Sequence, residues 1–133
     1  MTYPTQHISV SIQCPAAEVY DFASNPANLP RWAAGLGASI RKNGEEWVAA
    51  SPMGEVKVRF VARNAYGVLD HDVTLPSGET VNNPMRVIPN GAGCDVVFTL
   101  RRRPGMTEEE YAADAQAVKR DLEKLKQLFE ISR

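Results

Sequence analysis

The sequence predicts an α+β fold in which a curved, seven-stranded antiparallel sheet wraps around one long C-terminal helix. Three observations predict it: a strand of alternating residues opens the chain, five turn signals follow between residues 43 and 93, and one amphipathic helix closes the chain. Turns this short join only antiparallel neighbours, so the strands between them form a meander. A chain of 133 residues is long enough for one core, and we expect a single domain over residues 1–133.

The predicted order begins with one strand and two short helices. Apolar and polar residues alternate over residues 8–13, as in a strand with one buried face. A first helix is predicted over residues 15–24, because proline suits the first helical turn and apolar residues then recur at helical spacing. Asn25 and Pro26 predict the cap and first turn of a second short helix, which ends near Trp32.

Five turn signals divide the middle of the chain at spacings of about ten residues. Asn43-Gly44 is the strongest, because a two-residue type I′ turn needs positive φ at both positions and these residue types tolerate it. The other four are Pro52-Met53-Gly54, Asn64-Ala65-Tyr66-Gly67, Pro76-Ser77-Gly78 and Pro89-Asn90-Gly91-Ala92-Gly93. Five turns imply six strands, which make seven with the opening strand.

The final helix is predicted from Thr107 to about Ile131. Thr107 and Glu110 have the spacing of a capping box, in which each side chain accepts a hydrogen bond from the backbone of the other. Acidic residues fill the first turn and basic residues the later turns, as the helix dipole favours. Its apolar stripe consists of Tyr111, Ala115, Val118, Leu122, Leu125 and Phe129. We expect this stripe to pack inward against the sheet.

The composition argues against several classes of partner. Hydrophobic residues make up 44% of the chain and charged residues 23%, and the net charge is -1, so no overall field attracts nucleic acid. The basic cluster of residues 101–103 is expected to be a solvated strand end. No apolar stretch approaches the roughly 20 residues of a membrane span, and the N-terminal residues lack a signal-peptide pattern. We therefore expect a cytoplasmic protein that does not insert into membranes.

The residue spacings also argue against a metal centre or a cofactor. Cys14 and Cys94 belong to no C-x-x-C or Cys/His pattern, and two cysteines cannot form a disulfide framework. No phosphate-binding glycine motif and no G-x-S-x-G elbow occur. We expect no metal and no cofactor.

His71 is the main polar candidate for a functional site. Its strand alternates so that His71 shares the inner face with Leu69 and Val73. An inward histidine could be a satisfied core residue, could hydrogen-bond a ligand, or could move a proton. Asp70 and Asp72 flank it, but adjacent strand residues point to opposite faces, so neither carboxylate should reach the ring. The same divergence makes this group a poor metal site.

An enclosed apolar space is expected between the bent sheet and the long helix, because one helix with many small residues cannot readily fill it. Large side chains would line this space. The candidate ligand-binding residues are Trp32, Trp47, Phe60, His71, Met85, Phe98, Tyr111 and Val118. On the strand after Gly54, the residues predicted to face inward are Val56, Val58, Phe60 and Ala62. Those predicted to face outward are Lys57, Arg59 and Arg63.

The order of these elements resembles the helix-grip fold of the START-like (SRPBCC) superfamily, which includes the birch-pollen allergen family, lipid-transfer domains and polyketide cyclases. The most specific match runs from Ile8 to Trp32 and contains Cys14-Pro15-Ala16-Ala17-Glu18-Val19-Tyr20-Asp21-Phe22. This segment is similar to the bacterial polyketide cyclase/dehydrase-like branch. The resemblance implies a hydrophobic cavity between sheet and helix that receives lipids, sterols, polyketides or other flat apolar molecules. It implies no reaction, because catalytic residues are not shared across the superfamily.

Three functions remain open on the sequence. The first is binding of a small hydrophobic molecule that His71 orients. The second is a polyketide cyclase or dehydratase type of enzyme, in which the same cavity folds the substrate and His71 moves a proton. The third is an interaction module that uses the outer sheet face, although Lys57 and Arg59 argue against an apolar patch there. A homodimer is also left open.

Overall fold

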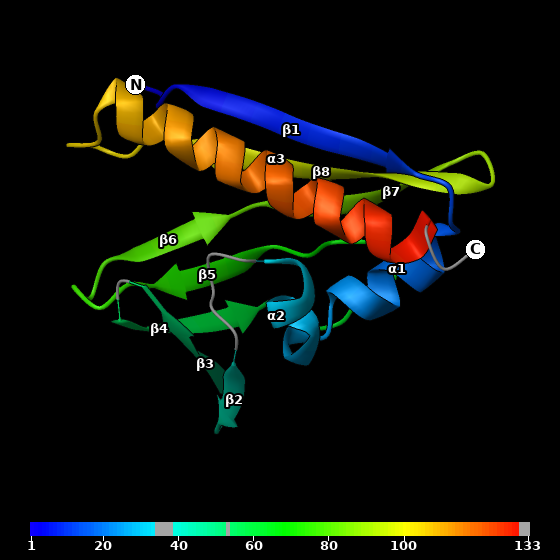
Figure 1. Cartoon of the computed structure of the whole chain (residues 1–133), viewed down its shortest axis with the longest axis horizontal. Coiled ribbons are helices and arrows are strands. Elements are labelled where there is room, and N and C mark those ends of the chain that lie inside the picture. The colour runs from blue at the N-terminus through cyan, green and yellow to red at the C-terminus, as the bar shows by residue number, and fades with distance from the viewer. Residues whose placement is uncertain (34–38, 53, 131–133) are drawn as a thin grey trace.

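The computed structural model describes residues 1–33, 39–52 and 54–130. In chain order its elements are β1 (Thr5–Ile12), α1 (Ala16–Ala23), η1 (Pro26–Asn28), α2 (Leu29–Trp32), β2 (Ile40–Asn43), β3 (Glu46–Ser51), β4 (Gly54–Phe60), β5 (His71–Thr74), β6 (Thr80–Asn83), β7 (Met85–Asn90), β8 (Gly93–Arg101) and α3 (Glu108–Glu130). The α+β class and the long C-terminal helix are confirmed (Figure 1). Both short helical segments follow the first strand, as predicted.

The strands form two antiparallel sheets. The first has the order β1-β8-β7 and the second the order β2-β3-β4-β5-β6. Helix α3 packs against β1, β8 and α2. In Figure 1 it runs along the strands of the three-stranded sheet, and the five-stranded sheet extends away on its other side.

The predicted count of seven strands treats residues 79–88, between two turn signals, as one strand. The structure divides this segment at Pro84, so that β6 pairs with β5 in one sheet and β7 pairs with β8 in the other. Proline lacks the backbone N–H that a continuous ladder would need at this position. The described residues therefore form eight strands in two sheets, and the chain passes from one sheet to the other where the prediction placed the middle of a strand.

A short ladder of hydrogen bonds, which we call the seam, still joins the two sheets beside this break. The N–H of Leu69 donates to the carbonyl of Met85 at 2.9 Å, and the N–H of Val87 donates to the carbonyl of Gly67 at 2.9 Å. The Asp70 carboxylate accepts a further bond from the N–H of Met85 at 2.9 Å. Asp70 thus satisfies the first backbone donor after the proline.

Helix α3 begins with the predicted capping box. The Thr107 hydroxyl accepts from the N–H of Glu110 at 3.0 Å, and the Glu110 carboxylate accepts from the N–H of Thr107 at 2.9 Å. Near its other end, Glu130 accepts a bond from the N–H of Gln13 at 3.0 Å, which ties α3 to the residue after β1. The predicted end of the helix at Ile131 lies outside the described residues.

The core lies between the sheets and the three α-helices. Its largest fully buried side chains include Ile12, Leu29, Leu69, Met85, Leu122 and Leu125. The apolar stripe of α3 packs inward as predicted: Leu122 and Leu125 are 0% exposed, while Val118 and Phe129 are half-buried against the core. On β4, Val58 is buried as predicted, but the prediction for Ala62 is wrong. Ala62 is exposed because the strand, and with it the alternation, ends at Phe60.

Candidate functional site

Three aromatic rings meet where the two sheets join. The imidazole of His71 stacks on the ring of Phe60, with centroids 4.7 Å apart and planes inclined by 19°. It also meets the ring of Phe98 edge-on, with centroids 6.1 Å apart. Met85, which pairs with Phe98 across β7 and β8, is buried. The structure thus brings four of the predicted ligand-binding residues together. We call Phe60, His71 and Phe98 the ring cluster.

The hydrogen bond of His71 fixes which ring nitrogen carries the proton. Nδ1 lies 2.9 Å from the carbonyl oxygen of Leu69, and a carbonyl only accepts, so Nδ1 is the donor and Nε2 is left as an acceptor. Burial lowers the pKa of His71, against weaker opposing effects of the Leu69 carbonyl and of the charges of Asp70 and Asp72. As predicted, neither carboxylate bonds to the ring: Asp70 accepts from the backbone of Met85, and Asp72 faces β6. The imidazole is neutral at pH 7.

Because burial lowers the pKa of His71, we expect the fold to lose stability in mild acid. In the unfolded chain His71 titrates near 6.5, so at pH 5 the unfolded state binds a proton that the folded state resists. The contribution of neutral His71 to the free energy of unfolding is complete above pH 6.5 and decreases below it. At pH 5 the decrease is at most about 2 kcal/mol. Urea unfolding at pH 7.5 and pH 5 should show a smaller loss for His71→Gln than for the unsubstituted protein. His7 is present in both proteins and cancels, and equal losses would contradict the prediction.

Two other predicted ligand-binding residues carry buried polar atoms without a partner. Trp32 is 5% exposed, and its indole Nε1 is buried without a hydrogen bond to any described residue. The hydroxyl of Tyr111, at the start of α3, is also buried and has no hydrogen-bond partner among the residues that the structure describes. An unsatisfied buried polar group costs about 1–3 kcal/mol. Trp47 and Val118 pack against the core as half-buried side chains.

The basic cluster of residues 101–103 ends β8 with Arg101 exposed, as predicted, but Arg102 and Arg103 are half-buried near the start of α3. Arg102 donates to the carbonyl of Met106 at 2.9 Å, and Arg103 donates to the carboxylate of Glu79 at 2.8 Å. Their side chains are only 32% and 31% exposed. Arg102 thus stabilises the turn before α3, and Arg103 links this turn to the β5–β6 connection. The prediction of a solvated strand end did not include these contacts.

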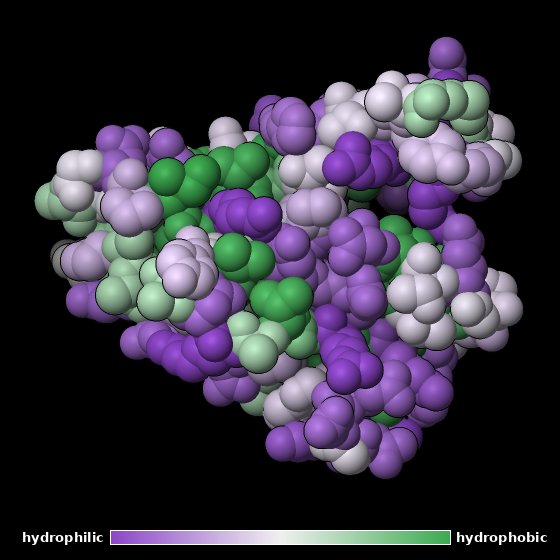
Figure 2. All heavy atoms as spheres, turned by 180° about the vertical axis from the view of Figure 1, so that it is seen from behind, coloured by the Kyte–Doolittle hydropathy of each residue, from purple (hydrophilic) through white to green (hydrophobic). Residues whose placement is uncertain are grey.

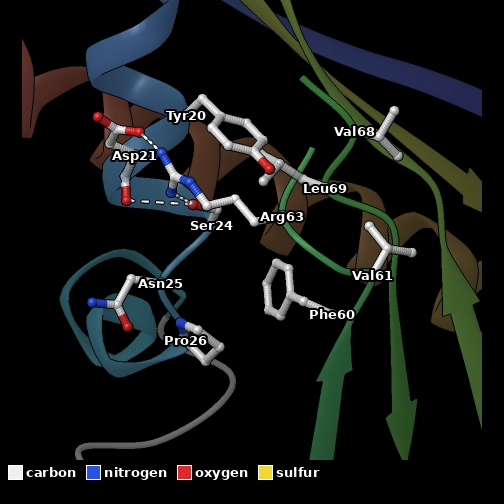
Figure 3. A pocket seen from close by; sticks show the side chains of 10 residues that line it. All are labelled: Tyr20, Asp21, Ser24, Asn25, Pro26, Phe60, Val61, Arg63, Val68 and Leu69. Carbon is white, nitrogen blue, oxygen red and sulfur yellow. Dashed lines mark hydrogen bonds and ion pairs between the residues drawn. The ribbon is translucent and has the colours of Figure 1, made fainter. Parts of the chain in front are cut away.

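An open pocket of about 310 Å³ lies between the end of α1 and the end of β4 (Figure 3). Arg63 crosses it: its guanidinium forms an ion pair with Asp21, donates to the Ser24 hydroxyl at 3.1 Å, and lies 5.0 Å from the ring centre of Tyr20. Phe60 lines the same pocket, so one member of the ring cluster borders this surface. Of the predicted ligand-binding residues, Phe60 is the one that lines this pocket.

The sequence did not reveal this arrangement of Arg63. The prediction assigned it to the outer face of a strand, but the strand ends at Phe60 and the chain turns toward α1. Asn64 organises the turn, because its side chain accepts from the N–H of Tyr66 at 2.9 Å and its own N–H donates to the Tyr20 hydroxyl at 2.8 Å. The sequence predicted a turn at Asn64, but it did not predict that this turn packs against α1.

The described part of the chain contains no group of three or more His, Cys, Asp or Glu residues placed to hold a metal ion. Cys14 and Cys94 are both buried. The thiol of Cys14 donates to the Glu18 carboxylate at 3.1 Å, and burial raises the pKa of Cys94 to about 11. Within the same residue ranges, no helix is both long and apolar enough to cross a membrane.

The face turned away from α3 is mainly hydrophilic, with smaller hydrophobic groups between the polar residues (Figure 2). The large hydrophobic side chains exposed in the body of the molecule are Val61, Tyr66 and Ile88. None of the three belongs to the outer face of the five-stranded sheet. This surface therefore adds no support to an interaction module built on that face.

Comparison with known proteins assigns the family. The family model described as "Polyketide cyclase / dehydrase and lipid transport" matches residues 5–130, whereas no curated protein matches the chain. The Aha1 dimer of Colwellia psychrerythraea is similar in structure, with a TM-score of 0.77, 13% identity and 98% of each chain covered. The protein XoxI of Bacillus cereus gives a TM-score of 0.73, 15% identity, and coverage of 100% of this chain and 99% of its own. DynU16, from the dynemicin biosynthetic locus, gives a TM-score of 0.74 and 14% identity, covering 97% of this chain and 48% of its own. At these identities the solved structures share the fold, and the family model, which spans almost the whole sequence, shows that this chain belongs to the polyketide cyclase/dehydrase and lipid transport family.

Proposed function

We propose that this protein binds a small hydrophobic molecule in its interior, between the two sheets and α3. Apolar side chains that face the core and yet stay partly exposed are the main support. Trp47, Val58 and Val73 lie side by side on β3, β4 and β5, but only Val58 is fully buried. Phe60 and Phe98 also pack against the core and remain partly exposed. In a solidly packed interior such side chains would be covered, so they offer apolar surface that a bound molecule could cover.

The family supports the same function. Its description names cyclisation and dehydration of polyketides together with lipid transport, and each of these requires a protein that receives an apolar molecule. The predicted ligand-binding residues fit this role, since most of them belong to the core cluster or pack against it. Helix α3 packs mainly against β1, β8 and α2, whereas η1 packs against β2 of the five-stranded sheet.

Binding of the neutral fluorescent probe N-phenyl-1-naphthylamine tests this proposal. We expect one probe molecule per chain, with increased fluorescence on binding. Val73→Phe should weaken binding at least fivefold, because the larger ring occupies the space beside Val58 on the inner face of the sheet. Lys57→Phe, which adds the same ring to the exposed face of β4, is the matched control and should leave the affinity unchanged. Absence of probe binding, or equal loss in both variants, would refute an interior site.

An enzyme that uses the same interior is the second candidate. The neutral imidazole of His71 favours it, because Nε2 is an acceptor nitrogen that could take up a proton from a bound substrate. With a linear poly-β-ketone as substrate, His71→Gln should lower turnover by about 10²- to 10⁴-fold while binding is retained if the protein is an enzyme. A carrier should show no turnover above background and only a modest change in affinity in the same variant.

A further inference from the structure

The first strand, β1, has a free edge. Within the part of the chain that the structure describes, β1 pairs with β8 alone and ends the three-stranded sheet. In Figure 1 it lies along the upper rim of the molecule, and no other labelled element lies beyond it. The free edge of a strand presents backbone N–H and C=O groups that can pair with another strand.

Two backbone hydrogen bonds show which residues of β1 face this edge. The N–H of Arg102 donates to the carbonyl of Pro4 at 2.9 Å, in register with the β1–β8 ladder. Because hydrogen-bonded pairs alternate along an antiparallel ladder, the even-numbered residues of β1 bond to β8. The N–H of Thr99 donates to the carbonyl of Pro84 at 2.9 Å, so the odd-numbered residues of β8 bond to β7, as this alternation requires. The backbone groups of the odd-numbered residues of β1 therefore point to the free edge.

Helix α3 occupies one end of this edge. Lys126 donates to the carbonyl of Ser11, and Glu130 accepts from the N–H of Gln13 at 3.0 Å. Both of these backbone groups belong to odd-numbered residues, in agreement with the alternation. The remaining odd-numbered residues of β1, which we call the open edge, are Thr5, His7 and Ser9. No described residue forms a hydrogen bond with the backbone N–H or C=O groups of the open edge.

The open edge also lacks the features that keep exposed edge strands from pairing. Proteins protect such edges with charged side chains, with proline or with a bulge. From Thr5 to Ile12, β1 contains no lysine, arginine, aspartate, glutamate or proline, and its pairing with β8 is continuous. The side chains of His7 and Ser9 are exposed on the outer face of the sheet, so they leave the backbone accessible from the side.

We propose that β1 pairs with β1 of a second copy of this chain in antiparallel orientation, which joins two three-stranded sheets across a symmetric dimer. One alignment uses every group of the open edge: His7 lies opposite His7 of the second copy, and Thr5 lies opposite Ser9 of the second copy. It forms about six hydrogen bonds, two for each pair. An alignment shifted toward the end of β1 would place Thr5 opposite Ser11, whose carbonyl already accepts from Lys126. Because the same edge is used by both copies, the assembly closes as a dimer.

Sedimentation velocity of the full chain measures this association. We expect a monomer at about 1 μM and a growing fraction of dimer up to about 0.5 mM, as for a small specific interface. Ser9→Pro should weaken the dimer at least tenfold, because each copy loses an N–H that donates to the other strand. The monomer should stay folded, since an edge strand accepts proline where the N–H faces solvent. Ser9→Ala is the matched control and should leave the association unchanged. A monomer at all concentrations, or an equal dimer in Ser9→Pro, would overturn the proposal.

Hydrogen exchange of the unsubstituted protein tests the same pairing without dependence on the folding of a variant. The amide protons of Ile8 and Val10 face β8 and should be protected from exchange at every protein concentration. Those of His7 and Ser9 face the free edge, so they should exchange rapidly in dilute protein and at least tenfold more slowly in the dimer. Exchange of His7 and Ser9 at the same rate in dilute and concentrated protein would overturn the pairing of the open edge.

Cysteine substitution tests the alignment. Opposite residues in a hydrogen-bonded pair have Cα atoms about 5.5 Å apart, which a disulfide can span. His7→Cys should therefore form a covalent dimer on oxidation with copper–phenanthroline, and a reductant should reverse it. Ser9→Cys is the matched control, because Ser9 would lie opposite Thr5 and about 13 Å from its own copy. The unsubstituted protein should not crosslink, since Cys14 and Cys94 are buried. Covalent dimers from Ser9→Cys alone, or from neither variant, would overturn this alignment.

Discussion

Replacing Gly67 with alanine is expected to lower the free energy of unfolding by about 2–5 kcal/mol. Gly67 has φ of +70°, which costs about 1–2 kcal/mol for a residue with a side chain. An added Cβ would also overlap the backbone carbonyl oxygen of Val87, its hydrogen-bonded neighbour in the seam. Backbone cannot move aside as a flexible side chain does, so we add about 1–3 kcal/mol for the displacement. Urea unfolding monitored by tryptophan fluorescence measures the total.

Gly91→Ala is the matched control for this prediction. Gly91 has a similar φ of +59°, but an added Cβ would meet no atom within 4 Å. Its substitution should therefore cost only the conformational part, about 1–2 kcal/mol. Equal losses in the two variants would show that the close approach between Gly67 and Val87 contributes nothing to stability.

Replacing Leu122 with alanine is expected to lower the free energy of unfolding by about 3 kcal/mol, within the range of 2–5 kcal/mol found for buried leucines. Leu122 is 0% exposed and lies in the core cluster near the middle of α3. Alanine removes the buried methyl groups and leaves a cavity that the surrounding residues close only in part. Thermal and urea unfolding at pH 7.5 should both report the loss.

Val118→Ala is the comparison for this substitution, because Val118 belongs to the same stripe one turn earlier but is only half-buried. It removes less buried surface, and we expect a loss of about 1 kcal/mol or less. If Val118→Ala proved as costly as Leu122→Ala, the most tightly packed part of α3 would lie one turn closer to its N-terminus than the structure places it.

Local patterns in the sequence predicted much of the fold. The capping box needs only Thr107 and Glu110 at the right spacing, and both of its hydrogen bonds form. The alternation that placed His71 and Met85 inward depends on backbone geometry alone, and both side chains are buried. Such features succeed because the interactions that create them lie within a few residues along the chain.

The features that the sequence could not reveal depend on distant segments. The sequence predicts one strand over residues 79–88. Only the different pairing partners of β6 and β7, on either side of Pro84, show that this segment belongs to two sheets. Arg63 and Asp21 are 42 positions apart, and their ion pair exists because the chain leaves β4 toward α1. Likewise, the sequence marks Trp32 as a large inward residue, but whether its N–H finds an acceptor is decided by the whole interior.

Beside Pro84, few hydrogen bonds join the two sheets. Within each sheet, backbone hydrogen bonds join the strands. The seam joins the two sheets to each other through the hydrogen bonds of Gly67, Leu69 and Asp70 to the start of β7. Any widening or narrowing of the angle between the sheets must stretch these few bonds before it disturbs the others. The amide protons of Leu69 and Val87 take part in the seam, so their exchange with solvent deuterium would report separation of the two sheets, including any that the proposed ligand requires.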